Sequence, residues 1–295
     1  MRLLISLLCP ICLSLMISPL LAQVPAKSVV WFHSDFPPIS IISGPFKDRG
    51  AADQWGALLM QQMPDYQHEL IPANAARLQE EMKQRGNGCS RALLKNPERE
   101  KNFIFSEPLV SFLPNGLITL RSRKADLEPF LNERGELRLD ALLNARKFEI
   151  AVAAGRSFGP SIDPVLQAGS AQGKLVQFNA SDLFSSGLLR LSNHQGVDAV
   201  MGYAIELSWA IRRFDLKPSQ FWFIPVEGET ALLPVHIACS RSPTGEAIIG
   251  QINALVHEGK LPDAAARAYR DWLPADIAQY YDRRRKPAAS GKRSK

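Results

Sequence analysis

The chain has 295 residues, of which 46% are hydrophobic, and a formal net charge of +6 at pH 7. This length suffices for one large domain or two ordinary ones, each with a sizeable core. Seven basic residues and one acidic residue lie within 282–295, and without this segment and Arg2 the net charge is −1. The charge is therefore no argument for nucleic-acid binding, and we expect no nucleic-acid partner.

The N-terminus has the pattern of a secretory signal peptide. A basic start is followed by the apolar run 3–21, which contains two prolines. A spanning helix needs about 20 mostly apolar residues, so this broken run fits a signal peptide at 1–22 better than an anchor. Cleavage after Ala22 or Ala26 suits the preference for small residues. An uncleaved anchor remains the alternative, since Leu20 is larger than the residue preferred three positions before Ala22.

Two of the four cysteines lie within the expected signal peptide, which leaves Cys89 and Cys239. An exported chain meets an oxidising compartment, where two remaining thiols tend to form a disulfide. Their spacing and the scattered histidines do not suit a zinc site. We therefore predict a disulfide between Cys89 and Cys239, and we expect neither a metal nor a cofactor.

Strand-like and helix-like segments alternate along the chain, which predicts an α/β protein. In chain order, strands are expected at 28–32, 68–71, 103–105, 116–120, 148–153, 175–178, 197–201, 221–226 and 234–238. Helices are expected at 53–63, 74–85, 182–193, 204–214, 246–257 and 263–272. The polar stretch 121–136 marks a change of composition where a second lobe begins.

Three short motifs resemble one family in their order and spacing: Asp-Phe-Pro-Pro at 35–38, Asn-Pro-Glu-Arg-Glu at 96–100 with Phe-Ser-Glu-Pro at 105–108, and Gly-Val-Asp-Ala-Val at 196–200. They resemble family 3 bacterial periplasmic solute-binding proteins, which include the polar amino-acid receptors of ABC transporters. The resemblance covers nearly the whole mature chain. The residues around both cysteines resemble a separate branch of this family more than the amino-acid receptors themselves.

The resemblance implies a type 2 periplasmic-binding fold, a two-lobed clamshell in which each lobe is a mixed sheet flanked by helices. Two crossing strands would join the lobes, and a ligand would bind in the cleft between them. Lobe 1 would contain 27–112 and the returning segment 234–281, with the disulfide inside it, and lobe 2 would contain 113–233. The basic segment 282–295 is expected to be a disordered tail that either contacts anionic surfaces such as lipid headgroups or is simply solvated.

The resemblance also implies ligand-binding residues on lobe 1. Arg99 matches the arginine that holds a ligand carboxylate in the amino-acid receptors, although a surface salt bridge with a nearby glutamate is the alternative. Asp35 and Phe36 follow the first strand, where Phe36 either forms an aromatic cleft wall or packs under the two prolines. Ser90, next to Cys89, either faces the ligand or belongs to a simple turn.

Lobe 2 departs from the family pattern. Where the amino-acid receptors have an acidic residue for the ligand's α-ammonium group, this chain has Gly202 and Tyr203, with Glu206 one helical turn later. An α-amino acid ligand is therefore in doubt. Tyr203 can stack on or hydrogen-bond a different solute, and Glu206 can replace the acid if its helix faces the cleft. The alternatives are a packing role for Tyr203 and a surface position for Glu206.

These features predict a monomeric periplasmic protein that binds a small polar solute, which can carry a carboxylate, for ABC-type uptake through a membrane permease. A sensor or adaptor with the same clamshell, acting on a membrane receptor, is the alternative. An enzyme such as a dehydratase is less favoured, because the sequence has no GxSxG, HExxH or phosphate-binding motif. The Gly-rich turn at 155–159 lacks the lysine of a P-loop. We therefore expect no enzymatic activity.

Overall fold

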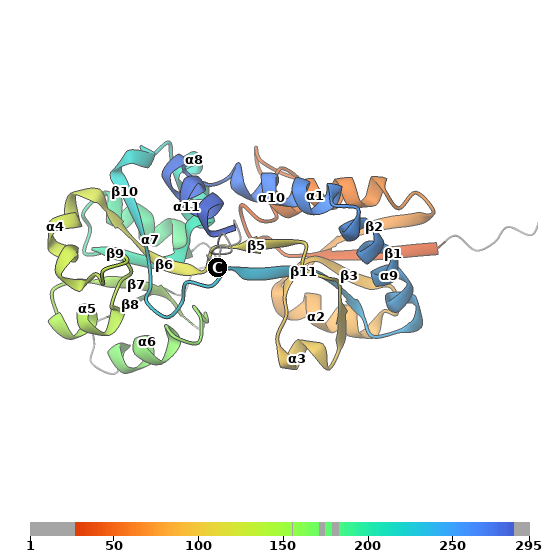
Figure 1. Ribbon diagram of the computed structural model, residues 1–295, viewed down its shortest axis with the longest axis horizontal. Coiled ribbons are helices and arrows are strands. Elements are labelled where there is room, and N and C mark those ends of the chain that lie inside the picture. The colour runs from red at the N-terminus through yellow and green to blue at the C-terminus, as the bar shows by residue number, and fades with distance from the viewer. Residues whose placement is uncertain (1–26, 155, 171–174, 179–182, 286–295) are drawn as a thin grey trace, which may run out of the picture.

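The computed structural model describes residues 27–154, 156–170, 175–178 and 183–285, which form two lobes side by side (Figure 1). Each lobe is a mixed sheet with helices on its faces, so the expected clamshell architecture is confirmed. The predicted signal peptide lies outside the described residues. Within the described part of the chain, no helix is long and apolar enough to cross a membrane.

Lobe 1 is built on a sheet with strand order β2-β1-β3-β11-β4, in which β5 also pairs with β11. In β1, residues 29–32 are all buried, as expected for a parallel strand covered on both faces. Its strands are β1 (Lys27–His33), β2 (Tyr66–Pro72), β3 (Gly88–Leu94), β4 (Phe103–Phe105), β5 (Val110–Phe112) and β11 (Leu233–Ser240). Its helices are α1 (Ala51–Gln61), α2 (Ala75–Gln84), α3 (Pro97–Glu100), α9 (Pro243–His257) and α10 (Lys260–Arg270).

Lobe 2 is built on a sheet with strand order β10-β6-β9-β7-β8. Strands β7, β8 and β9 are parallel, and β6 runs antiparallel to β9 and β10. The strands are β6 (Asn115–Leu120), β7 (Ile150–Ala153), β8 (Leu175–Phe178), β9 (Ala199–Tyr203) and β10 (Phe221–Pro225). The α-helices are α4 (Lys124–Leu127), α5 (Leu139–Ala145), α6 (Asp163–Ser170), α7 (Leu183–Ser192) and α8 (Ala204–Phe214), and short 3-10 turns lie at Arg121–Arg123, Glu128–Phe130 and Pro218–Gln220.

The chain passes from lobe 1 to lobe 2 between β5 and β6 and returns between β10 and β11. Helix α11 (Ala275–Arg285) follows and contacts both lobes, because its Asp276 pairs with Arg121 of lobe 2 and its Tyr281 packs on Tyr269 of lobe 1. This helix includes the first four residues of the segment expected to be a tail, and 286–295 lie outside the described residues.

The predicted disulfide is confirmed. Cys89 of β3 and Cys239 of β11 are bonded, with their Cα atoms 4.0 Å apart. They face each other directly in the antiparallel β3–β11 pair, although they are separated by 150 positions in the sequence. The bond therefore fixes the returning segment in the middle of the lobe 1 sheet.

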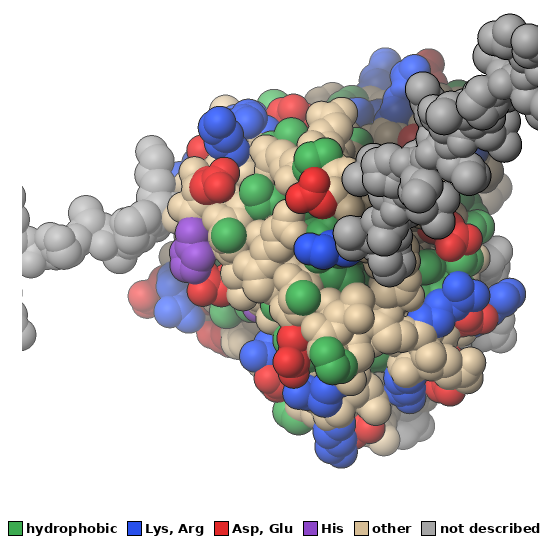
Figure 2. Space-filling model, turned by 90° about the vertical axis from the view of Figure 1, so that its right-hand side faces the viewer, with side chains coloured by type: hydrophobic (Ala, Val, Ile, Leu, Met, Phe, Trp, Pro, Cys, Tyr) green, Lys and Arg blue, Asp and Glu red, His purple; other side chains and the backbone are tan. Residues whose placement is uncertain are grey.

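Figure 2 shows the end of the molecule formed by lobe 1. On this face, the side chains of Lys and Arg are interspersed with those of Asp and Glu, and apolar side chains lie singly between them. The described residues on this face therefore form no continuous basic surface of the kind that binds nucleic acids.

Candidate functional site

A cavity of ≈ 130 Å³ lies on lobe 1 at the carboxyl ends of β1 and β3. Open α/β sheets bind ligands at this edge, because loops and helix N-termini present polar groups there. The side chains that carry polar or aromatic groups into its lining are those of His33, Ser34, Phe36, Ser40, Gln79, Ser90, Arg91 and Arg99.

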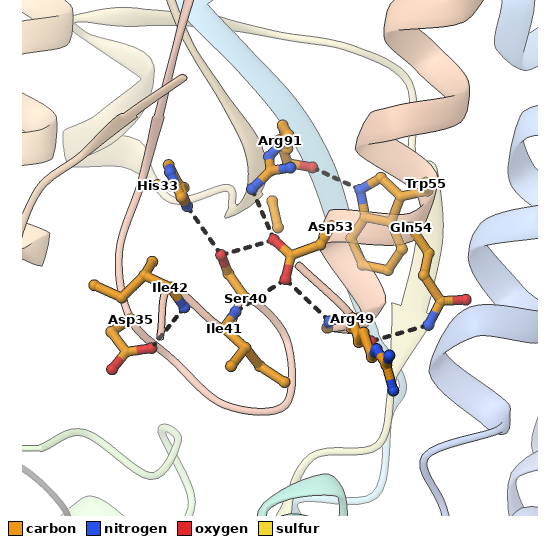
Figure 3. Close-up of polar contacts among 12 residues, drawn as sticks. His33, Asp35, Ser40, Ile41, Ile42, Arg49, Asp53, Gln54, Trp55 and Arg91 are labelled. Atoms are coloured by element: carbon orange, nitrogen blue, oxygen red, sulfur yellow. Dashed lines mark hydrogen bonds and ion pairs between the residues drawn. The ribbon is translucent and has the colours of Figure 1, made fainter. Parts of the chain in front are cut away.

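Behind this cavity, Asp53 is the centre of a buried polar cluster (Figure 3). Its carboxylate accepts hydrogen bonds from Ser40 Oγ at 3.0 Å, from the backbone N–H groups of Ile41 at 2.9 Å and Gly50 at 3.0 Å, and from Arg91 Nη2 at 2.9 Å. Both charged side chains of the pair are only 4% exposed. Asp53 therefore holds the loop after β1, the start of α1 and strand β3 in one arrangement.

Arg91 reaches Asp53 because α1 leaves space for it. A Cβ atom on Gly56 would lie 2.5 Å from Arg91 Cδ, so the arginine side chain lies directly on this glycine. The carbonyl oxygen of Arg91 accepts a hydrogen bond from Trp55 Nε1 at 3.1 Å. Three residues of helix α1, Asp53, Trp55 and Gly56, therefore set the position of Arg91.

The hydrogen bonds of Ser40 determine the tautomer of His33. Ser40 donates its single hydroxyl hydrogen to Asp53, so its oxygen accepts from His33 Nδ1 at 3.2 Å. Burial, and secondly the charge of Arg91, lower the pKa of His33, so the ring is neutral at neutral pH. The neutral ring then has its lone pair on Nε2, available to a hydrogen-bond donor in the cavity that it lines.

Arg99 lies on the short helix α3 and lines the same cavity. Asn96 caps the helix by accepting from Arg99 N at 2.8 Å, and Arg99 Nη1 donates to Leu94 O at 2.7 Å. Burial lowers the pKa of Arg99, but its pKa remains that of a guanidinium charged at neutral pH.

The three glutamates that lie near Arg99 in the sequence are engaged elsewhere. Glu98 pairs with Lys101, Glu100 with Lys95, and Glu107 with His257. Among the described residues, Arg99 has no carboxylate partner.

Lobe 2 presents Arg156, Tyr203 and Glu206 at the lobe boundary, where Tyr203 contacts Phe36 of lobe 1. The Arg156 guanidinium donates to both carboxylate oxygens of Glu206, at 2.8 and 2.7 Å. Desolvation opposes the charge on Arg156, but the interactions with Glu206, and after them those with Tyr203, more than offset it and raise the pKa of Arg156. Glu206 also accepts from Tyr203 N at 2.9 Å, so its carboxylate is already bound by groups of its own lobe.

The two lobes meet at Phe36. Its ring forms an edge-to-face contact with Tyr203, with the centroids 6.4 Å apart, and it also lines the lobe 1 cavity. Phe36 therefore lies between the cavity with Arg99 and the lobe 2 residues, and the residue is 36% exposed. Burial is the largest effect on Tyr203 and raises the pKa of its hydroxyl.

The remaining predicted residues are placed differently. Ser90 is buried within β3 and lines the cavity, with its hydroxyl 3.5 Å from Ala92 O. Asp35 is exposed and accepts a hydrogen bond from Ile42 N at 3.2 Å within its own loop. The structure thus brings Phe36, Ser90 and Arg99 to one cavity, whereas Asp35 lies outside its lining.

A second cavity, of ≈ 370 Å³, lies between α11 and β10, away from the cleft residues. Its lining includes Trp222 and Tyr280, and its three arginines are engaged: Arg121 pairs with Asp276, Arg134 pairs with Glu136, and Arg284 donates to Thr230 O. It lies away from the carboxyl ends of β1 and β3, although it is the larger of the two. In the described part of the chain, no group of three or more His, Cys, Asp or Glu side chains could hold a metal ion.

Comparison with known proteins supports the fold. No family model and no curated protein sequence matches the chain. Among solved structures, the extracellular-binding protein YtmK of Bacillus subtilis, described as a probable amino-acid ABC transporter component, is 14% identical with a TM-score of 0.57, covering 84% of this chain and 99% of that one. The periplasmic VFT2 domain of Bordetella pertussis BvgS is 18% identical with a TM-score of 0.53, covering 83% and 92%.

An ancestral arginine-binding protein bound to arginine is also similar, at 16% identity and a TM-score of 0.56, covering 84% of this chain and 99% of that one. Similarity at these identities shows the fold alone, and it extends over more than four-fifths of this chain. The chain therefore has the two-lobed type 2 periplasmic-binding fold of the family 3 solute-binding proteins that its sequence resembles.

Proposed function

We propose that this protein binds a small carboxylate-bearing solute in the cleft between its lobes, outside the cytoplasm. The observation that carries the proposal is Arg99, a half-buried cation that lines the lobe 1 cavity and has no carboxylate partner among the described residues. A planar guanidinium group can hold a carboxylate through two parallel hydrogen bonds. The other two cleft arginines, Arg91 and Arg156, are already paired with Asp53 and Glu206.

Neutral groups of the same cavity can orient the solute. His33 Nε2 offers an acceptor to a ligand hydroxyl, and Phe36 offers an apolar face. The disulfide supports a location in an oxidising compartment, which agrees with the predicted signal peptide. N-terminal sequencing of the protein recovered from the periplasmic fraction tests the cleavage site and the location together.

A thermal-shift screen of metabolites tests binding, because a ligand present at a hundredfold excess over its Kd stabilises the folded state by about 2.7 kcal/mol. For a carboxylate that stabilises the wild type, Arg99→Ala should weaken binding about 10- to 100-fold, since a charge-assisted hydrogen bond contributes about 1.5–3 kcal/mol. Arg77→Ala is the matched control, because Arg77 is 66% exposed and pairs with Glu81 on the surface of α2. Equal affinities of the two variants would refute the role of Arg99.

Transport by an ABC-type permease is the role we favour, and sensing is the second candidate. Both have support among the structural neighbours, which include a probable ABC transporter binding protein and a histidine kinase sensor domain. Uptake of the radiolabelled ligand by cells that lack the gene separates them: transport requires a large loss of uptake, whereas sensing leaves uptake intact. Recovery of the ligand unchanged after incubation with the protein tests the expectation that no reaction is catalysed.

A further inference from the structure

The Arg156 guanidinium group is surrounded by the kinds of group that bind cationic ligands in proteins: a carboxylate, an amide oxygen and aromatic rings. It forms two parallel hydrogen bonds with the Glu206 carboxylate, and its Nη2 also lies 3.4 Å from Asn115 Oδ1. The Glu206 side chain is only 7% exposed. A buried carboxylate requires a counter-charge, and Arg156 provides it from a loop 50 positions earlier in the chain.

Three aromatic rings surround the same guanidinium group. Its Cζ lies 4.9 Å from the ring centroid of Tyr203, 5.4 Å from that of Phe158 and 5.9 Å from that of Phe36. Cations within about 6 Å of a ring centroid are attracted by the ring face, and aromatic cages of this kind hold cationic ligands in other proteins. Phe36 belongs to lobe 1 and the other two rings to lobe 2, so this cage lies where the lobes meet.

From this geometry, we infer that the Arg156 side chain fills a cation-binding subsite in the cleft. A solute whose positive charge would have to lie in this subsite is therefore excluded. Together with Arg99, this restricts the ligand to anions that lack an ammonium or guanidinium group next to the carboxylate. The restriction on the ligand rests on the proposed function. The occupancy of the subsite by Arg156 does not, and it can be tested without a known ligand.

Arg156→Ala tests the occupancy with methylguanidinium chloride as the probe. Removing the side chain leaves Glu206 buried without its counter-charge and opens the space among the three rings. Millimolar methylguanidinium should then raise the melting temperature of this variant above its value in equal sodium chloride. Neither the wild type nor Arg156→Ala/Glu206→Gln should show the difference, because the first has no free subsite and the second has no carboxylate.

The inference is overturned if Arg156→Ala responds to methylguanidinium no more than the wild type does, or if the double variant responds equally. Should Arg156→Ala fail to fold alone, it is refolded with methylguanidinium or with sodium chloride, and circular dichroism measures recovery. Recovery that requires methylguanidinium supports the occupancy. Failure to recover under conditions in which the double variant folds refutes it.

Matched ligand pairs test the exclusion in the wild type. Glutarate is compared with L-glutamate, and 3-phenylpropanoate with L-phenylalanine, by thermal shift. Stabilisation by the member without an amino group supports the exclusion, and stabilisation by the amino acid overturns it. If no member of either pair stabilises the wild type, that result counts against the carboxylate ligand of the proposed function, while the methylguanidinium comparison still decides the role of Arg156.

Discussion

Each lobe contains an arginine–carboxylate pair that is largely buried, Asp53–Arg91 in lobe 1 and Glu206–Arg156 in lobe 2, and the surroundings of the two pairs differ. In lobe 1, Asp53 and Arg91 are each 4% exposed, and Asp53 also accepts from backbone groups of two segments. In lobe 2, Arg156 is 21% exposed and lies among aromatic rings at the boundary with lobe 1. The same pair of charges thus organises the backbone in one lobe and lies among aromatic rings at the lobe boundary in the other.

This difference predicts that breaking the Asp53–Arg91 pair lowers the free energy of unfolding more than breaking the Glu206–Arg156 pair does. Asp53→Ala leaves Arg91 buried without a counter-charge and removes the acceptor of Ile41 N and Gly50 N, so we expect a loss of about 3–5 kcal/mol in the free energy of unfolding. Urea denaturation measures it. Glu206→Ala should cost less, because its partner Arg156 has access to water and to the faces of three rings.

Asp65→Ala, which removes an exposed carboxylate of the same lobe, is the control for Asp53→Ala. The comparison between the lobes would be wrong if Asp53→Ala lowered the free energy of unfolding no more than Asp65→Ala does. It would also be wrong if Asp53→Ala lowered it less than Glu206→Ala does. Either result would mean that Arg91 finds water or another acceptor when its partner is removed.

The disulfide adds a second contrast, since it joins two strands of lobe 1 and the described part of lobe 2 has none. Cys89→Ala/Cys239→Ala should lower the free energy of unfolding by about 2–5 kcal/mol, because the bond closes a loop of 150 positions. Hydrogen exchange should rise mainly in β3 and β11, and little in β7 and β9. A uniform rise in both lobes would show that the two lobes unfold as one unit.

The sequence was sufficient for the architecture and the disulfide, but not for every strand. Strand β3 begins Gly-Cys-Ser-Arg, a sequence that suggests a turn, yet these four residues are all buried. Ser90 and Arg91 line the cavity, and Arg91 also belongs to the buried cluster, so these polar residues interrupt the apolar pattern of the strand. Helix α11 was missed because it is highly charged and packs through few residues, among them Ile277 and Tyr281.

The sequence indicates fewer of the cavity residues than of the fold. The family resemblance points to Arg99 and Phe36, because each lies within a short local motif. Arg156 lies in a Gly-rich sequence that contains no sign of a charged pair, and its partner Glu206 lies 50 positions away. The Asp53–Arg91 pair spans 38 positions. Such pairings depend on which loops meet at the edge of a sheet, and local spacing does not reveal them.

The smallest predicted effect concerns His33, whose protonation makes the stability of the folded protein depend on pH. Burial, and then the charge of Arg91, lower its pKa below the ordinary value of 6.5, and the nearby Asp53, Asp48 and Asp35 oppose this shift without cancelling it. Because the unfolded chain then binds a proton more readily than the folded protein, stability should fall as the pH drops below about 6.5 and be unaffected by this group above it.

His33→Asn keeps an N–H donor near Ser40 and removes the titration, so it should reduce the loss of melting temperature between about pH 7.5 and pH 5.5. His194→Asn, which removes an exposed histidine at a backbone φ of 55° that asparagine tolerates, is the control. A wild type and a His33→Asn variant with parallel melting profiles over this range would show that the imidazole can be protonated inside the folded lobe at no cost. The neutral ring, and with it the acceptor at Nε2, would then have to be abandoned as part of the binding cavity.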